Sequence, residues 1–171
     1  MTSPTRDSQV ADVRPAVSAR VITVSDRSAA GVRDDLSGPA ARSVLEAAGY
    51  DVTTVIVPDG EDVVEAALRE ALASGTRLVV TSGGTGVGPR DRTPEGTRRV
   101  VERELPGVAH LLLMRGLRAS PHAALSRGIV GVSGRSVIAN LPGKPSAVTE
   151  SLEVLVPLFP HLFSQLDGGD H

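Results

Sequence analysis

Short hydrophobic runs alternate with amphipathic stretches along the first half of the chain. Three runs rich in valine, isoleucine and threonine end in polar loops; they are residues 19–24, 51–57 and 77–81. Such β-branched runs predict strands. Residues 39–48 and 61–74 lie between them, have helical periodicity, and are followed by Gly49 and Gly75 as stop signals. The alternation predicts an α/β fold with a mostly parallel sheet and right-handed crossovers.

The second half adds further helices and a hairpin. Thr93 can cap a helix with Pro94 at its first position, running to about Leu105. Further helices are expected at 110–117 and 121–126, a hairpin at 128–132 and 136–141, and a helix at 146–166 that two prolines kink or break. The predicted architecture has three layers: a mostly parallel sheet flanked by helices, with a C-terminal β-hairpin and helix.

The 171-residue chain fits a single domain with a full hydrophobic core. Residues 1–18 and 167–171 show neither helical nor strand periodicity, so we expect flexible tails around one domain at 19–166. No apolar run approaches the 18 residues that a membrane span requires, the chain has no cysteine, and it begins without a secretion signal. A cytoplasmic protein without a membrane partner is the expectation.

The net charge and the aromatic content limit the classes of partner that the protein is expected to bind. The net charge is −2, the isoelectric point is near 6.1, and the only aromatic residues are one tyrosine and two phenylalanines. Neither a basic surface nor base-stacking platforms are therefore expected, which argues against a nucleic-acid partner. A small molecule or another subunit is favoured.

A glycine-rich loop follows the third predicted strand. Four of the six residues from 83 to 88 are glycine, and Arg90, Asp91 and Arg92 come shortly after. Glycines leave backbone N–H groups uncovered, so the loop predicts contacts with phosphate. The lysine of a Walker A loop is missing, because Lys144 is the only lysine, and the glycine spacing does not fit a Rossmann fingerprint.

Polar residues follow each predicted strand and should meet at one edge of the sheet. Ser25, Asp26 and Arg27 follow the first strand, Asp59 the second and the glycine loop the third. Backbone donors and arginines suit phosphate oxygens, and carboxylates suit Mg²⁺, so the set predicts phosphoryl or nucleotidyl transfer.

Structural roles remain open for several of these residues. Asp59 lies in a Pro-Asp-Gly turn signal, and Ser25-Asp26 can also cap a helix. Asp34 and Asp35 are more readily explained as caps of the next helix than as ligand contacts. Lys144 follows a Leu-Pro-Gly turn that either presents N–H groups to an anion or simply exposes the lysine.

Five motifs, taken in order, resemble the molybdopterin adenylyltransferase family, which comprises the Mog and MoaB group and related domains of gephyrin. They are Val24-Ser25-Asp26-Arg27, Pro58-Asp59, Gly83-Gly84-Thr85-Gly86 with Arg90-Asp91-x-Thr93-Pro94, Leu125-Ser126-Arg127, and Leu141-Pro142-Gly143-x-Pro145. The resemblance covers about residues 19–166. It implies a MoaB/Mog-like homotrimer that transfers AMP from ATP to the terminal phosphate of molybdopterin with Mg²⁺, in molybdenum cofactor biosynthesis.

The resemblance also implies roles for individual residues. Asp59 and Asp91 correspond to catalytic acids and are the expected Mg²⁺ ligands, while Ser126 corresponds to a pterin contact. Other implied substrate or nucleotide contacts are Ser25, Asp26, Arg27, Ser82, Gly83, Gly84, Thr85, Gly86, Arg90, Thr93, Arg127, Pro142, Gly143 and Lys144. The alternative is a non-catalytic, molybdopterin-binding MoaB-type carrier or scaffold that serves other cofactor-synthesis proteins. The intact aspartate motifs favour the enzyme.

Overall fold

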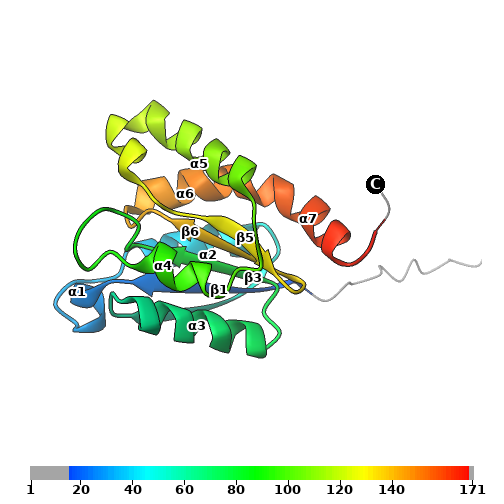
Figure 1. Ribbon diagram of the computed structural model, residues 1–171, viewed down its shortest axis with the longest axis horizontal. Helices are drawn as coiled ribbons and strands as arrows, with labels where there is room; N and C mark the ends of the chain where they lie inside the picture. Colours follow the sequence, from blue (N-terminus) through cyan, green and yellow to red (C-terminus); the bar gives the residue numbers. More distant parts are fainter. Residues whose placement is uncertain (1–15, 170–171) are drawn as a thin grey trace, which may run out of the picture.

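Four parallel strands form the larger part of a six-stranded sheet in the computed structural model, which describes residues 16–169 (Figure 1). The strand order is β2-β1-β3-β6-β5-β4; β5 pairs antiparallel with β6, and β4 pairs antiparallel with β5. The strands are β1 (Ser18–Val24), β2 (Asp51–Val57), β3 (Leu78–Ser82), β4 (Arg103–Glu104), β5 (Val130–Ser133) and β6 (Ser136–Leu141). The predicted mostly parallel sheet and its hairpin are confirmed.

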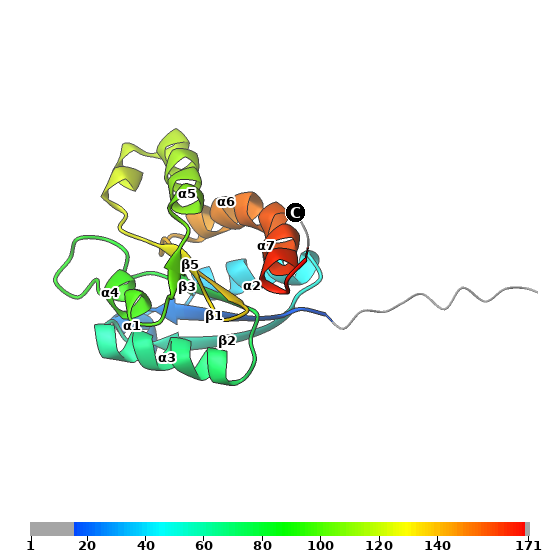
Figure 2. The same ribbon diagram turned by 45° about the vertical axis from the view of Figure 1, so that its right-hand side comes forward.

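Helices cover both faces of this sheet (Figures 1 and 2). The α-helices are α1 (Asp26–Ala29), α2 (Ser37–Ala47), α3 (Glu61–Ala73), α4 (Thr93–Arg98), α5 (Pro106–Ala119), α6 (Pro145–Leu155) and α7 (Phe159–Leu166), and the 3-10 helices are η1 (Pro121–Leu125) and η2 (Val156–Leu158). One face carries α2, α5, α6 and α7, and the other carries α3 and α4. The predicted three-layer α/β architecture is therefore confirmed.

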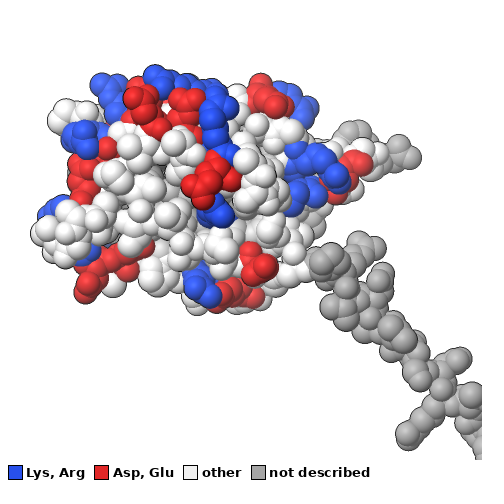
Figure 3. Space-filling view, turned by 90° about the horizontal axis from the view of Figure 1, so that it is seen from below, with Lys and Arg blue, Asp and Glu red and all other residues white. Residues whose placement is uncertain are grey.

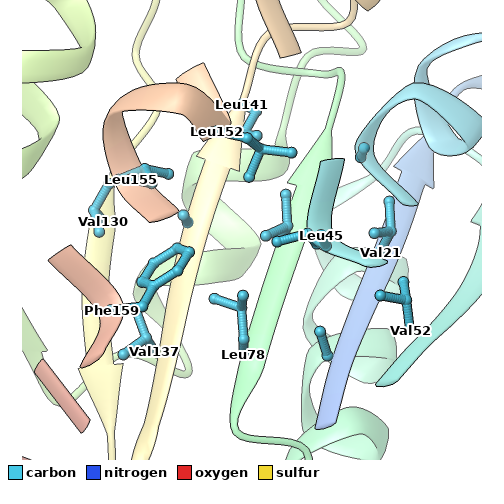
Figure 4. Close-up of a cluster of buried hydrophobic side chains, with 14 of the residues drawn as sticks. Val21, Leu45, Val52, Leu78, Val130, Val137, Leu141, Leu152, Leu155 and Phe159 are labelled. Atoms are coloured by element: carbon cyan, nitrogen blue, oxygen red, sulfur yellow. The ribbon is translucent and has the colours of Figure 1, made fainter. Parts of the chain in front are cut away.

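Two hydrophobic clusters lie on opposite faces of the sheet. Adjacent residues of a strand point to opposite faces, so Val21 packs in the larger cluster with α2, α6 and α7, while Ile22 packs in the smaller one with α3. Phe159 is fully buried in the larger cluster (Figure 4). Burial on both faces explains why the parallel strands are nearly continuous hydrophobic runs.

The segment after α4 differs from the predicted helix. The helix ends at Arg98 instead of near Leu105, and the chain pairs with β5 through the short strand β4. The N–H groups of Glu102 and Leu105 donate to the carbonyl oxygens of Val132 and Val130 over 2.9 and 2.7 Å. These bonds to the sheet replace the helical bonds that local propensity favoured. The one-turn helix α1 was also not predicted, whereas the predicted break near Pro157 and Pro160 is confirmed.

Residues just outside the predicted domain bounds of 19 and 166 also make contacts with the domain. Ser18 already belongs to β1, and Asp167 forms ion pairs with Arg77 (3.0 Å) and Arg135 (2.6 Å). Most of the expected tails, residues 1–15 and 170–171, lie outside the described residues. Within residues 16–169, no helix is both long and apolar enough to cross a membrane.

Candidate functional site

The loops that follow β1, β2, β3 and β6 meet at one edge of the sheet. In the parallel register Thr23 pairs with Ser82, and Ser82 pairs with Leu141, so these strands end at the same level. α1, the glycine loop and the start of α6 consequently lie at the same end of the molecule (Figures 1 and 2). The predicted convergence of strand ends is what the fold produces.

The glycine loop can be built only with glycine at its first two positions. Gly83 has φ +103° and Gly84 has φ +64°, a region that L side chains rarely adopt. A Cβ at Gly83 would collide with the Val24 carbonyl oxygen, and one at Gly84 would collide with the Thr93 hydroxyl. The sharp turn and close packing leave the loop backbone uncovered by side chains.

Thr93 fixes this turn and does not cap α4. Its hydroxyl donates to the Gly83 carbonyl oxygen over 2.9 Å, and its N–H donates to the Gly84 carbonyl oxygen over 3.1 Å. Arg92 is the N-cap residue of α4 and makes no side-chain capping bond. The predicted cap was therefore wrong: the buried threonine bonds to the glycine loop.

Asp26 and Asp59 tie the ends of β1 and β2 together. The Asp26 N–H donates to Asp59 Oδ2 over 2.8 Å, and the Asp59 N–H donates to Asp26 Oδ1 over 3.0 Å. Arg90 donates to both Asp26 carboxylate oxygens, each over 3.0 Å, and to the Asp59 carbonyl oxygen over 2.7 Å. The hydrogen bonds from Arg90 lower the pKa of Asp26 below its ordinary value.

Asp91 lies on the far side of the same loop. Its Oδ2 accepts from the Gly88 N–H over 2.9 Å, and a Cβ at Gly86 would lie 2.8 Å from that oxygen. On the other side, a Cβ at Gly84 would lie 3.2 Å from Asp59 Oδ1. The two predicted catalytic acids therefore flank the glycine loop at positions two residues apart.

Arg127 binds the protein rather than open space. Its guanidinium donates to the carbonyl oxygens of Gly86 and Asp91, each over 2.7 Å, and to a carboxylate oxygen of Glu95. Burial is the largest single influence and acts to raise the pKa of Glu95, but the hydrogen bond from Arg127, a backbone hydrogen bond and the nearby charges of Arg127 and Arg92 together lower that pKa. These contacts make Arg127 a clamp on the loop, and the substrate contact predicted for it stays a prediction.

Two cavities open beside the loop. The smaller, about 330 Å³, has a mainly polar lining, in which Ser25, Ser82, Gly143 and Lys144 were predicted as site residues. The larger, about 480 Å³, lies between α5, η1 and α6; its lining includes leucines and alanines together with Thr85, Gly86, Ser126 and Pro142. Lys144 lines both cavities. The Pro142-Gly143-Lys144 turn therefore stands between a polar compartment and a mostly apolar one.

Some of the predicted site residues line a cavity, whereas others make contacts only within the protein. Arg90 is occupied by Asp26. The predicted site residues that line neither cavity are Asp26, Arg27, Asp59, Gly83, Gly84, Arg90, Asp91, Thr93 and Arg127. Asp35 is the helix cap that the sequence favoured: its Oδ1 accepts from the N–H groups of Ser37 and Gly38, each over 3.0 Å. Asp34 and Asp35 both line the smaller cavity, and ligand contact by either stays a prediction.

Sequence reasoning missed Arg33 and Asn140. Arg33 lines the smaller cavity from the loop after α1. No local pattern in the sequence distinguishes this arginine from a solvated one. Asn140 is buried in β6 and bonds to the side chains of Thr81 and Thr97. A polar residue inside a hydrophobic run was the available signal for it.

The residues present fit a magnesium ion that takes part of its coordination from a substrate. Within residues 16–169 no three acidic or histidine side chains gather as a protein-only metal site. Asp59 Oδ2 and Asp91 Oδ2 accept backbone N–H groups, and no hydrogen bond in this part of the chain uses their Oδ1 atoms. Mg²⁺ is commonly held by one or two carboxylates plus phosphates and water. Two free carboxylate oxygens flanking a phosphate-type loop meet that requirement.

One face of the molecule carries charges of both signs. On the face below α3, acidic and basic side chains are interspersed (Figure 3). Arg99, for example, pairs with Asp62 (2.8 Å) and Glu65 (3.0 Å).

Comparisons with known proteins agree with this geometry. The molybdopterin adenylyltransferase of Helicobacter pylori strain J99 is 41% identical over 154 residues, which cover 86% of this chain and 86% of that protein. The molybdenum cofactor synthesis protein cinnamon of Drosophila melanogaster is 38% identical over 144 residues, so 82% of this chain matches only 24% of that longer protein.

Comparison with solved structures points to the same group of proteins. The structure of the molybdopterin biosynthesis Mog protein from Mycobacterium ulcerans has a TM-score of 0.84 at 40% identity, covering 88% of this chain and 99% of that one. Residues 20–161 match the family described as "Probable molybdopterin binding domain". The resemblance that the five motifs indicated is confirmed, and the chain belongs to this family of molybdopterin binding domains.

Proposed function

We propose that this protein is a molybdopterin adenylyltransferase of molybdenum cofactor biosynthesis. It transfers AMP from ATP to the terminal phosphate of molybdopterin and releases pyrophosphate. The observation that carries the proposal is the pair of adjoining cavities, one polar and one mostly apolar, that share Lys144 beside the glycine loop. A reaction that joins a nucleotide to a pterin phosphate needs two compartments that meet at the reacting phosphates.

The chemistry of the two linings supports an assignment of each substrate. The smaller cavity has Arg33 and Lys144 for phosphate oxygens and Asp34 as an acceptor for ribose or base N–H and O–H groups, so it takes ATP. The larger cavity combines the apolar side of α5 with Ser126 and Thr85, so it takes the flat pterin and its polar edge. Both substrates then direct their phosphates toward Lys144 and the loop amides.

The transfer step needs no general base. A terminal phosphate oxygen of molybdopterin, already anionic, forms a bond to the α-phosphorus of ATP. The bond from that phosphorus to the bridging oxygen breaks, and pyrophosphate leaves with the electron pair. The protein brings two polyanions together and holds them in line, and it stabilises charge with loop N–H groups and Lys144.

Asp59 and Asp91 would hold Mg²⁺ through their free oxygens. When bound, the ion supplies charge neutralisation for the phosphates. Arg90 keeps Asp26 and the Asp59 backbone in place, and Arg127 does the same for the Gly86 and Asp91 carbonyl groups. The two arginines thus hold the two loops that present the carboxylates.

A homotrimer is part of the proposal on family grounds. Along α5, Leu111, Met114 and Leu117 are 44%, 50% and 39% exposed, which is an unusual cost for apolar side chains in a monomer. Contact with another subunit would remove these side chains from water. Sedimentation equilibrium tests this proposal, which predicts three times the chain mass; a monomer would contradict it. A cytoplasmic location and contacts with other cofactor-synthesis proteins stay predictions.

One assay tests the activity. The purified protein is incubated with molybdopterin and Mg-ATP, and pyrophosphate release and adenylyl-molybdopterin are quantified. We expect one pyrophosphate per molybdopterin consumed, and none when either substrate is omitted. Tight binding of molybdopterin without any release would contradict the proposal and point to a carrier.

A further inference from the structure

Asn140 is a buried polar side chain whose hydrogen-bonding groups are all used within the protein. It is 4% exposed and borders the larger cavity just before the Leu141-Pro142 turn. Its Nδ2 donates to Thr81 Oγ1 over 3.0 Å and to Thr97 Oγ1 over 2.9 Å, and its Oδ1 accepts from the Ile129 N–H over 3.2 Å. Both amide hydrogens and the carbonyl oxygen are occupied, so the side chain has no donor left for a substrate.

The three partners of Asn140 belong to three different parts of the site. Thr81 lies in β3, two residues before Gly83. Thr97 lies in α4, the helix that follows Asp91. Ile129 follows Ser126 and Arg127 in the segment that leads into β5. One amide group therefore links the strand before the loop, the helix after it and the segment beside the larger cavity.

A continuous chain of hydrogen bonds runs from Asn140 to the loop. The Thr97 hydroxyl, which accepts from Asn140, donates to the Thr93 carbonyl oxygen over 2.8 Å. Thr93 in turn donates from its hydroxyl and its N–H to the carbonyl oxygens of Gly83 and Gly84. Thr81, Thr93 and Thr97 are fully buried. Hydrogen bonds in such a dry network reinforce one another and hold one geometry.

From this geometry we infer that Asn140 is a positioning residue for adenylyl transfer. It fixes the glycine loop and α4 against β6, and acts through Thr97 without touching either substrate. The kinetic consequence rests on the proposed function, because in-line transfer is sensitive to small displacements of the phosphate-binding groups. The fixing of the loop does not depend on that function and can be measured separately.

The kinetic test compares hydroxyl removal with hydroxyl retention at one buried position. Thr97→Val removes the link at nearly constant volume, and Asn140→Ala removes it from the other side; Thr97→Ser keeps the hydroxyl. We expect kcat to fall about 10- to 100-fold in the first two variants while KM for ATP and molybdopterin stays within about threefold. Thr97→Ser should restore kcat to within about threefold of wild type, and the double variant Asn140→Ala/Thr97→Val should lower kcat no more than about twofold further.

Ser136→Ala is the matched control. Ser136 is buried in the same strand β6, and its hydroxyl donates to the Thr76 carbonyl oxygen over 2.7 Å at the end away from the site. The Ser136→Ala variant loses a buried hydrogen bond comparable to the one lost in Thr97→Val. Its unfolding midpoint should therefore fall, while kcat stays within about twofold of wild type. Equal losses of kcat in Ser136→Ala and Thr97→Val would overturn the inference.

Amide hydrogen exchange provides a readout that needs no turnover. N–H groups in residues 83–93 should exchange about tenfold faster in Thr97→Val and Asn140→Ala than in wild type or Ser136→Ala. Unchanged exchange in that segment would overturn the inference whether or not the wild type adenylylates molybdopterin. If Thr97→Val does not fold, Thr81→Val removes one Asn140 acceptor and undergoes the same two measurements. A wild type without pyrophosphate release would instead refute the proposed function.

Discussion

The two sides of the glycine loop are held by different kinds of contact. On the β1 and β2 side, Asp26, Asp59 and Arg90 form charged hydrogen bonds near the surface, where the Arg90 side chain is 64% exposed. On the β6 side, Thr93, Thr97 and Asn140 form a network of neutral groups with almost no exposure. The charged side should respond to pH and salt, whereas the buried side should set the geometry of the loop under all conditions.

The two predicted catalytic acids lie one on each side of the loop. Asp59 is held by the Asp26 N–H, and Asp91 is held by the Gly88 N–H and, through its carbonyl group, by Arg127. Each acid keeps one oxygen fixed and one free. This arrangement presents two oxygens at fixed positions without burying either charge.

The largest expected effect comes from neutralising these acids. Asp59→Asn and Asp91→Asn keep an oxygen acceptor for the backbone N–H but remove the charge that would hold Mg²⁺. We expect kcat to fall about 100- to 1,000-fold in each variant, with unfolding midpoint and molybdopterin affinity close to wild type. Turnover measurements check this, and unchanged turnover in Asp91→Asn would exclude it from the metal site.

Breaking the Arg127 clamp should have the next largest effect. Arg127→Met removes three donors and leaves the Glu95 charge half-buried, so we expect a loss of about 2 kcal/mol in the free energy of unfolding. The control is Arg42→Met, which breaks an exposed pair with Glu46 at 2.7 Å and should cost no more than about 0.5 kcal/mol. Equal costs in urea denaturation would show that Arg127 is not a clamp.

Substitutions in the two cavities should affect the two substrates separately. Ser126→Ala should weaken molybdopterin binding about five- to tenfold and leave ATP binding unchanged, because it removes one hydrogen-bonding group from the larger cavity. Arg33→Ala should weaken ATP binding about tenfold and leave molybdopterin binding unchanged. Titration calorimetry with each substrate distinguishes these outcomes; weakened binding of both substrates by one variant would argue against separate compartments.

The smallest expected effect is the acid dependence of the charged side. Arg90 lowers the pKa of Asp26 below its ordinary 3.8, so the folded state favours the carboxylate. This contribution to stability is present above about pH 4 and is lost as the pH falls through the lowered pKa. The difference in unfolding free energy between wild type and Asp26→Asn should therefore shrink as the pH falls below 3.8. A difference that stays constant down to pH 2 would contradict the charge pairing.

The sequence was sufficient for the sheet and for the convergence of its loops, because strand periodicity and glycine placement are local signals. It predicted a cap for Thr93 because Thr-Pro at a helix start has that local meaning. The actual partner, the Gly83 carbonyl oxygen, is brought close only by the turn of the loop. Arg90 and Arg127 were expected to bind substrate, and their carboxylate and carbonyl partners lie up to 64 residues away along the chain. Such partners cannot be assigned before the strand order is known.

The two-compartment site is tested most directly by simultaneous binding. Adenosine, which lacks phosphates and so avoids the reaction centre, is titrated into protein saturated with molybdopterin and into free protein. We predict that the two Kd values for adenosine agree within about threefold, because the nucleoside and the pterin occupy adjoining cavities. A Kd for adenosine that rises in proportion to the molybdopterin concentration would mean one shared pocket and would contradict the account.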